Sequence, residues 1–324
     1  MTAPSEPLVS VVTPVHNGEA YLAECIESVL RQTYSNWEYV IVDNHSTDRT
    51  GEIARNYAQQ DSRVRVYATD TFLPLLANWN HALRQISPTS KYCKVVHADD
   101  WLFPECLHQM VELAEKYPSA GIVGAYRLDE DRVNLDGLKY SCGLVPGRDI
   151  GRWHFLGGRF LFGSPTSVLI RADLVWARHA FYNERNLHAD TEVCFDLLRG
   201  TDFGFVHQVL TFTRRHNETV TSINRRLNTY LPSELYVLHK YGRDYLSESE
   251  YQEALRAKLR IYYRFLGVSL LRLRKKDFWT QRQEFWSYHG KALKDLGHPL
   301  NRVRLVGAAA VVLYNGLLDK IRIP

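Results

Sequence analysis

Residues 8–15 read Leu-Val-Ser-Val-Val-Thr-Pro-Val and lead directly into the polar turn His-Asn-Gly at 16–18. A short run rich in β-branched residues that ends at a proline and a glycine-bearing turn predicts a buried strand followed by a loop. Residues 19–32 then carry apolar side chains every three or four positions, with acidic residues early and Arg31 late. This pattern predicts an amphipathic helix whose charges match its dipole.

The same alternation of strand and helix continues along the chain. It predicts an α/β fold with a right-handed, doubly wound and mostly parallel central sheet. Residues 127–152 are charged and lack a period, so we expect a long loop there. We expect strands at 8–15, 37–42, 64–68, 92–96, 121–126 and 203–212, and helices at 19–32, from the turn at 43–48 to about 60, at 75–86 and at 104–117.

The chain has 324 residues, of which 45% are hydrophobic, and this is enough for one large domain and an appendage. We expect an α/β domain over residues 1–220 and a helical region over 221–324. The first part carries 21 Lys and Arg against 27 Asp and Glu, and the second carries 19 against 9. The basic second part therefore favours an anionic surface or partner.

Five cysteines are widely spaced and form no C-x-x-C pair, which is typical of reduced thiols in a cytoplasmic protein. The first ten residues lack the pattern of a secretion signal, and no apolar stretch reaches the roughly 20 residues of a spanning helix. We therefore expect a cytoplasmic location, with peripheral contact at the inner face of the membrane as an option.

Residues 95–101 read Val-Val-His-Ala-Asp-Asp-Trp, so that an apolar strand ends abruptly in two carboxylates. Burying two adjacent ionised carboxylates is strongly unfavourable unless a cation, a proton or several donors offset the repulsion. Asp99 and Asp100 therefore predict a cation site. The alternative is a helix start, with an aspartate as N-cap and Pro104 in the first turn.

Polar clusters follow three of the expected strands, at 13–17, at 43–48 and at 99–100. The carboxyl ends of neighbouring parallel strands meet at one edge, where open α/β sheets bind ligands. The chain contains no G-x-G-x-x-G turn and no phosphate-binding G-x-x-x-x-G-K-[ST] loop. A nucleotide diphosphate bound here would need a metal ion, and carboxylates suit Mg²⁺ or Mn²⁺.

These segments, in this order, resemble family 2 glycosyltransferases with the Rossmann-like GT-A fold. The resemblance covers about residues 7–220, and it is carried by the opening Val-Val-Thr-Pro-Val-His-Asn-Gly, the stretch from Val42 to Thr50, Asn-Trp-Asn at 78–80, Ala-Asp-Asp-Trp at 98–101 and Ala-Asp-Thr-Glu at 189–192. It implies an inverting enzyme that moves a sugar from a nucleotide donor, a UDP-sugar, to a hydroxyl of a glycan or lipid-linked acceptor, assisted by Mn²⁺ or Mg²⁺.

The resemblance also implies roles for individual residues. Asp43 would accept a hydrogen bond from the uracil imide, whereas Asp48 is expected to hold its own turn. The family's metal motif is commonly Asp-x-Asp; here its first position is His97, either a donor-site residue or a core histidine, and Asp99 aligns as the metal ligand. The donor would also contact Thr13, Pro14, Val15, Asn78, Ala98 and Asp100.

Asp190 is the candidate general base, because the resembling family places an acidic residue at the start of this helix to deprotonate the acceptor; the alternative is a helix N-cap. Glu192 and Asp196, one turn apart, are expected to face solvent or to pair with Arg199. Arg214 and His216 match an Arg-x-His pattern, with Arg214 clamping the diphosphate and His216 completing the metal shell, or else they form a basic surface turn.

Arg256, Arg260 and Arg264 are spaced four apart and precede leucines and further basic residues. This basic amphipathic region either lies against an anionic membrane or packs its helices on the first domain. No interleaving of aromatic and basic residues favours nucleic acid. Two other functions are alternatives. His97 suggests a non-catalytic nucleotide-sugar-binding module. A nucleotidyltransferase would need a basic, glycine-rich first loop, which His-Asn-Gly at 16–18 does not supply.

Overall fold

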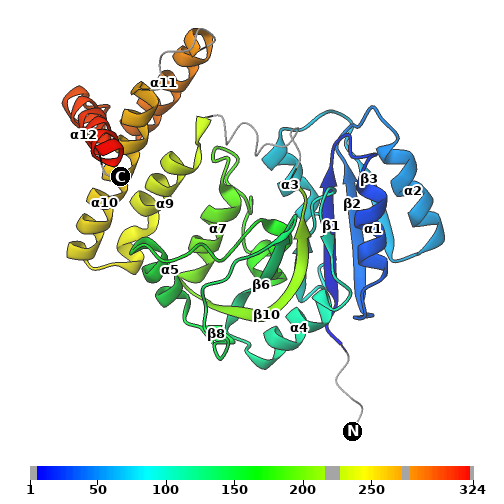
Figure 1. Ribbon diagram of the computed structural model, residues 1–324. Helices are drawn as coiled ribbons and strands as arrows, with labels where there is room; N and C mark the ends of the chain where they lie inside the picture. The colour runs from blue at the N-terminus through cyan, green and yellow to red at the C-terminus, as the bar shows by residue number, and fades with distance from the viewer. Residues whose placement is uncertain (1–5, 216–226, 272–277, 322–324) are drawn as a thin grey trace. The chain divides into compact units, whose positions relative to one another are not determined.

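The structure is a computed structural model and describes residues 6–215, 227–271 and 278–321 (Figure 1). The chain divides into two compact units, Met1–His216 and Asn217–Pro324. Each unit has its own apolar core, and each is described by itself below.

The first unit is built on one mixed sheet with the strand order β3-β2-β1-β4-β9-β6-β10-β5. The pairs β1 with β2, β1 with β4, β2 with β3 and β6 with β10 are parallel, and β9 runs antiparallel to both β4 and β6. The strands are β1 (Val9–Val15), β2 (Trp37–Asp43), β3 (Val64–Ala68), β4 (Tyr92–Val95), β5 (Trp101–Leu102), β6 (Ala120–Asp129), β7 (Arg132–Asn134), β8 (Leu144–Val145), β9 (Val168–Arg171) and β10 (Asp202–Thr213).

Helices cover both faces of this sheet, so its central strands are apolar on both sides. Side chains of α1, α2 and α4 share one buried cluster with Val9 and Val11 of β1, while α3, α6 and α7 pack against the sheet elsewhere. The helices are α1 (Leu22–Leu30), α2 (Thr50–Gln60), α3 (Leu75–Leu83), α4 (Cys106–Lys116), α5 (Gly147–Phe155), α6 (Ala172–Trp176) and α7 (Ala189–Leu198), with the 3₁₀ turn η1 (Pro165–Ser167) before β9.

The predicted strands and helices of the first half are confirmed to within a few residues, and so is the adjacency of β2, β1 and β4. The expected loop at 127–152 is wrong. The end of β6 forms a hairpin with β7, β8 pairs with β10, and α5 begins at Gly147. These pieces are two to nine residues long and β7 is exposed throughout, so no hydrophobic period marks them in the sequence.

The second unit contains α9 (Tyr230–Tyr245), α10 (Glu248–Leu271), α11 (Phe278–Asp295) and α12 (Arg302–Ile321). Its core holds a buried imidazole: Tyr262 Oη lies 2.7 Å from Nδ1 of His289, and Nε2 of His289 lies 2.8 Å from the Leu227 carbonyl oxygen. Burial lowers the pKa of His289 to about 4, so this histidine is neutral at physiological pH. Across the described ranges, none of the helices combines the length and apolarity needed to span a bilayer.

Substitution of Gly147 tests how closely the start of α5 packs against the backbone at Leu198 and Thr201. A Cβ at this position would overlap the carbonyl oxygens of Leu198 and Thr201. Because backbone atoms cannot move aside cheaply, we expect Gly147→Ala to lower the free energy of unfolding by about 1–3 kcal/mol or more. Urea denaturation followed by circular dichroism measures this change.

Gly200→Ala is the matched control, since nothing lies within 4 Å of a Cβ built there. It should change the free energy of unfolding by no more than about 0.5 kcal/mol. Equal stability of the two variants would show that α5 does not approach Leu198 and Thr201 as described.

Candidate active site

The acidic pair Asp99 and Asp100 follows β4 at the edge where the polar ends of β1 and β2 also lie. In the register of the sheet, Val12 of β1 pairs with Val95, and Val15 pairs with Asp43 at the end of β2. The polar ends of these three neighbouring strands therefore meet as the sequence predicts. The helix-start interpretation of the pair is wrong, because α4 begins only at Cys106, with Glu105 as its N-cap residue.

His97, Asp99 and Asp100 can present one ligand atom each within 4.8 Å of one another. One imidazole nitrogen and two carboxylate oxygens are a donor set that Mn²⁺ accepts and that Mg²⁺ tolerates less well. Nε2 of His97 is buried and has no hydrogen-bond partner among the described residues. A buried polar atom without a partner costs free energy, so its presence favours a bound group at this point.

Asp100 is the buried member of the pair. Its carboxylate accepts hydrogen bonds from the Arg214 backbone N–H at 3.1 Å and from the hydroxyl of Thr166. Burial, and next the charge of Asp99, raise the pKa of Asp100 to about 7. The pair therefore resists carrying two full negative charges unless a cation is bound.

Asp190 lies in the first turn of α7. The N-cap residue of that helix is His188, so the N-cap interpretation of Asp190 is wrong. Burial raises the pKa of the Asp190 carboxyl, while the Thr191 backbone N–H and the nearby His97 and Arg127 oppose that rise. The interaction with His97 places Asp190 near the metal-type cluster, and its raised pKa suits a group that must take up a proton.

An aromatic wall connects these two parts of the site. The ring of Trp79 lies 4.7 Å from His97 and 5.3 Å from Tyr182, measured between ring centroids. Asn80 fixes the segment before α7, since its side chain donates to the Tyr182 carbonyl at 2.9 Å and accepts from the Tyr182 N–H at 2.8 Å. Asn80 of helix α3 thus fixes the position of the segment that precedes Asp190.

Glu192 differs from its expectation of facing solvent or pairing with Arg199. It is buried, and its carboxylate accepts hydrogen bonds from the side chains of Asn183 and Asn186. It therefore ties the loop before α7 to the helix. Asp196, one turn later, pairs with Arg178 at 2.8 Å and also with Arg199.

The expected base-binding residues at the ends of β1 and β2 differ in where their side chains lie. The Thr13 hydroxyl is buried and donates to the Val96 carbonyl at 2.8 Å, so its side chain faces the core. Val15 and Ala98 both lie beside Gly18, where a Cβ would meet them. Asp43 accepts the Ser46 N–H at 3.1 Å.

The remaining residues expected near the base lie in strand β1, in the turn after β2 and in helix α3. Pro14 is buried next to Val15. Asp48 accepts the N–H groups of Thr50 and Glu19, which agrees with its expected role in its own turn. Asn78 is buried and its Oδ1 has no partner within the described part of the chain.

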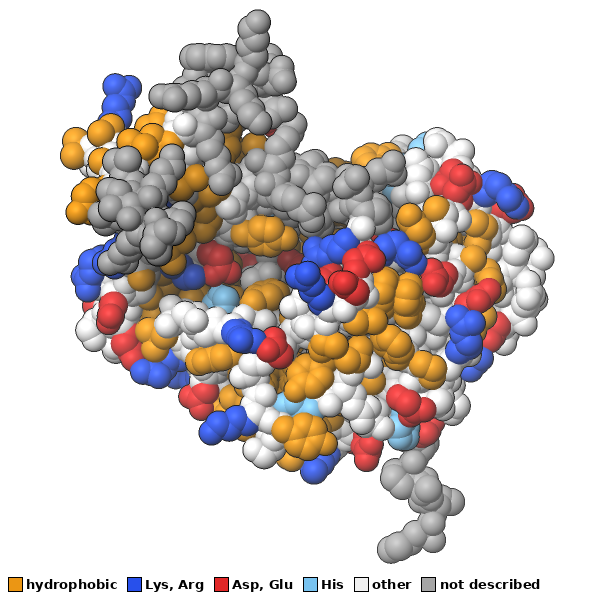
Figure 2. Space-filling view, in the orientation of Figure 1, with side chains coloured by type: hydrophobic (Ala, Val, Ile, Leu, Met, Phe, Trp, Pro, Cys, Tyr) orange, Lys and Arg blue, Asp and Glu red, His pale blue; other side chains and the backbone are white. Residues whose placement is uncertain are grey.

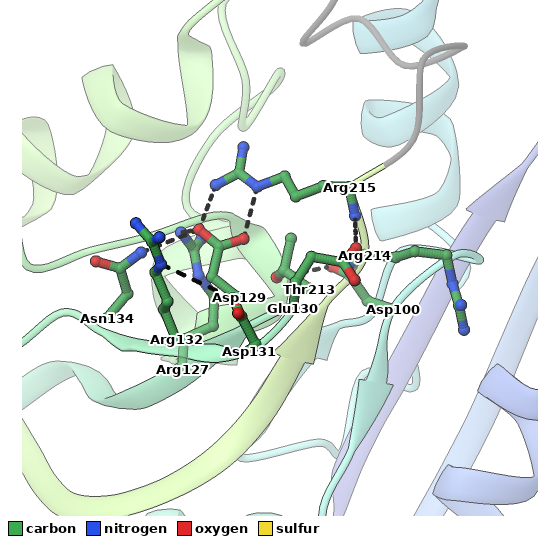
Figure 3. Close-up of polar contacts among 10 residues, drawn as sticks. All are labelled: Asp100, Arg127, Asp129, Glu130, Asp131, Arg132, Asn134, Thr213, Arg214 and Arg215. Carbon is green, nitrogen blue, oxygen red and sulfur yellow. Dashed lines mark hydrogen bonds and ion pairs between the residues drawn. The ribbon is translucent and has the colours of Figure 1, made fainter.

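Arg214 contacts the acidic pair through its backbone N–H, which donates to the Asp100 carboxylate, and through its side-chain Nε, which donates to the Asp99 backbone carbonyl oxygen at 3.3 Å. Its Nη2 donates to Glu24 at 2.6 Å, and its guanidinium carbon lies 4.6 Å from the Tyr21 ring centroid. Figure 3 shows this side chain extending away from Asp100. His216 lies outside the described residues.

Three residues of the site were missed by sequence reasoning. Thr166 accepts the His97 N–H at 3.1 Å and bonds to Asp100. The fully buried Lys94 donates to the carbonyl oxygens of Thr166 and Val168 at 2.6 and 3.2 Å. Neither has a local signal, because the chain between them spans more than seventy residues.

Arg127 is the third missed residue. Its side chain is 8% exposed and donates a hydrogen bond to Asp129 at 3.3 Å. Asp129 also accepts hydrogen bonds from the Arg215 side chain (Figure 3). The charge of Arg127 lowers the pKa of both Asp100 and Asp190, so it belongs to their electrostatic surroundings. The predicted strand ends at Tyr126, so Arg127 falls at the start of the expected loop. The observed strand β6 continues to Asp129.

Comparison with solved structures supports the fold. The TarS 1–349 fragment from S. aureus, solved in complex with UDP-GlcNAc, aligns with a TM-score of 0.65 at 18% identity, covering 94% of this chain and 87% of that one. The mannosyltransferase PcManGT of Pyrobaculum calidifontis, in complex with GDP-Man and Mn²⁺, aligns with a TM-score of 0.56 at 15% identity over 97% and 80%.

Sequence comparison identifies the family. The chain is 30% identical to the glycosyltransferase GlyG of Streptococcus pneumoniae over 66% of its own length and 72% of GlyG. It is 38% identical to EpsE of Bacillus subtilis over 42% of its length, and spans 48% of that relative. Residues 10–178 match the model of glycosyl transferase family 2. The chain therefore belongs to glycosyl transferase family 2.

Proposed function

We propose that this glycosyltransferase takes its sugar from a UDP-linked donor and passes it, with inversion, to a hydroxyl of a glycan or lipid-linked acceptor. The observation that carries the proposal is the approach of Asp190 to the His97, Asp99 and Asp100 cluster at the carboxyl end of β4. The UDP-GlcNAc complex of TarS and the Mn²⁺ complex of PcManGT, both of the same fold, support the choice of ligands.

The nucleoside would occupy the ends of β1 and β2. Val15 and Pro14 supply an apolar floor, and the Asp43 carboxylate accepts the imide N–H of uracil. The unpartnered Oδ1 of Asn78 offers a further acceptor for a base or ribose donor. Gly51 leaves room for Asp43, since a Cβ there would lie 2.7 Å from Oδ2 of the carboxylate.

The diphosphate would lie over Asp99, Asp100 and His97, which together with Ala98 form the turn after β4. A divalent ion bound there would neutralise the two carboxylates and stabilise the charge that develops on the leaving diphosphate. His97 in place of the family's usual first aspartate reduces the negative charge of the ligand set. Because imidazole suits Mn²⁺ better than Mg²⁺, we propose a preference for Mn²⁺.

Asp190 would act as general base in a single displacement. The acceptor oxygen forms a bond to the anomeric carbon while its proton passes to the Asp190 carboxylate. The bond from the anomeric carbon to the diphosphate oxygen breaks on the opposite face, so the configuration inverts. A sugar hydroxyl is barely ionised at neutral pH, so the positioned base contributes about 10²–10⁴-fold to the rate.

Replacing the base tests this assignment. Asp190→Asn should lower kcat for transfer by about 10²–10⁴-fold and change the donor KM little, because the base acts only on the acceptor proton. Steady-state release of nucleoside diphosphate measures both constants.

Asp196→Asn is the control on the same helix, since Asp196 pairs with Arg178 and Arg199 away from the cluster. It should retain near-full kcat. If Asp190→Asn kept full transfer activity, the chain would not use this base, and the alternative of a non-catalytic binding module would gain support.

Metal binding should depend on pH. The folded pKa of Asp100, about 7, exceeds its ordinary value of 3.8. Its protonation therefore stabilises the metal-free fold fully below about pH 4, and this contribution is lost as pH rises through 7. Because Mn²⁺ must displace the proton, its affinity should rise between about pH 5 and pH 8, as measured by isothermal titration calorimetry.

Asp100→Asn removes the titrating group. The metal-free variant should show a weaker dependence of Tm on pH over the same range and a Mn²⁺ affinity at least about tenfold lower. A wild-type Mn²⁺ affinity that stayed constant from pH 5 to about pH 8 would contradict the raised pKa.

A donor panel tests the nucleotide. UDP-sugars with Mn²⁺ should raise Tm and release UDP, whereas chelator should abolish both effects. Stabilisation reaches about 2.7 kcal/mol when a ligand is present at a hundred times its Kd. GDP- and dTDP-sugars serve as controls, and a response confined to either of them would overturn the choice of UDP.

A further inference from the structure

Helix α12 is apolar on two opposite faces. Its inner face packs on α10 through Leu305, Ala308 and Ala309. The two backbones approach closely at Gly267 of α10, where a Cβ would lie 2.9 Å from the Ala309 nitrogen. This crossing accounts for one apolar face of α12, and the other remains on the surface.

The outer face of α12 consists of Val303, Val306, Leu313 and Tyr314, which are 82%, 63%, 54% and 63% exposed. Their spacing of three, seven and one residues places them on one side of a helix. Orange side chains are visible over α10 and α12 at the upper left of Figure 2. A helix that is hydrophobic all round is normally buried, so this face points to a partner.

Exposed arginines lie towards the N-terminal end of this face, because Asn301 contacts Tyr263 of α10 and Ala309 lies beside Gly267. Arg302 and Arg304 lie in the first turn of α12, and residues 302–315 contain no acidic residue. On α10, the exposed Arg256, Arg260 and Arg264 lie one turn apart on the side that also carries Gly267. Helix α12 therefore crosses α10 on the side that bears these arginines.

We propose that the outer face of α12 and the flanking arginines dock on an anionic lipid bilayer, with α12 lying in the membrane interface. The apolar side chains would enter the acyl boundary while the guanidinium groups meet headgroup phosphates. The surplus of 19 basic over 9 acidic residues in 221–324 matches such a surface.

Charge disfavours a second copy of the chain as the partner. In a two-fold symmetric dimer through this face, the five arginines of one copy would meet the same five of the other. Like charges brought together across an interface weaken association. An anionic bilayer satisfies both the apolar side chains and the arginines.

The test uses the full chain in a vesicle flotation assay. Vesicles of phosphatidylcholine mixed with phosphatidylglycerol should bind the protein, whereas phosphatidylcholine alone should bind it at least about tenfold less. Binding should weaken as salt is added, since the arginine contribution is screened.

Two variants separate the apolar and the basic contributions. Val306→Asp should lower binding to anionic vesicles by about tenfold or more, and Arg256→Gln with Arg260→Gln and Arg264→Gln should do the same. The matched controls are Val133→Asp, at an exposed valine of β7, and Arg31→Gln with Arg132→Gln and Arg148→Gln, all at exposed arginines of the first unit. The controls should bind like the wild type.

Circular dichroism and UDP-sugar binding establish that each variant is folded. Three results would overturn the proposal: no binding to anionic vesicles, binding that Val306→Asp leaves unchanged, as a purely electrostatic polyanion site would, or a dimer that Val306→Asp dissociates in the absence of vesicle binding. Loss of transfer activity in Asp190→Asn without loss of vesicle binding would keep this inference separate from the proposed reaction.

Discussion

The repulsion between Asp99 and Asp100 is the constraint around which the first unit is arranged. Two adjacent carboxylates at the end of a buried strand cannot both ionise cheaply in a poorly hydrated site. Neutral groups donate hydrogen bonds to Asp100, among them the Thr166 hydroxyl and the Arg214 backbone N–H. The positive charge of Arg127 also favours the ionised form of Asp100. These groups lower the pKa of Asp100 only in part, because burial, and next the charge of Asp99, still raise it to about 7.

The reversed strand β9 makes this arrangement possible. It inserts between β4 and β6 and brings the preceding turn η1 beneath the acidic pair. Lys94 secures that turn from the core by donating to the Thr166 and Val168 carbonyl oxygens. Burial lowers the pKa of the Lys94 ammonium group, and these hydrogen bonds compensate in part for the cost of burying it.

The second unit follows a different principle. Its core is sealed by the neutral imidazole of His289 between Tyr262 and the Leu227 carbonyl, and its surface combines apolar and basic side chains. A bound cation would stabilise the acidic pair of the first unit, whereas bound anions would stabilise the arginines of α10 and α12. The ligands proposed for the two units therefore have opposite charge.

The sequence by itself determined the ends of β1, β2 and β4 to within one residue, because hydrophobic runs and turn residues are local signals. Since parallel neighbours share an edge, that was enough to bring Asp43, Asp99 and Asp100 to one side of the sheet. The expectation that β2, β1 and β4 are neighbours followed from the same local patterns, whereas the position of Asp190 at the start of a helix was implied by the family resemblance. The resemblance of several short segments to one family added the expected chemistry, which those local patterns do not contain.

Only the tertiary structure decided which side chains complete the site. Thr166, Arg127 and Lys94 act through partners far away in the chain, and Glu192 is buried by asparagines on a loop whose path no period reveals. Short pieces such as β7 and β8 are held by pairing with β6 and β10, so their own residues carry too little information to predict them. Local patterns predict the approximate bounds of the longer buried elements, but contacts between distant residues exist only once the chain has folded.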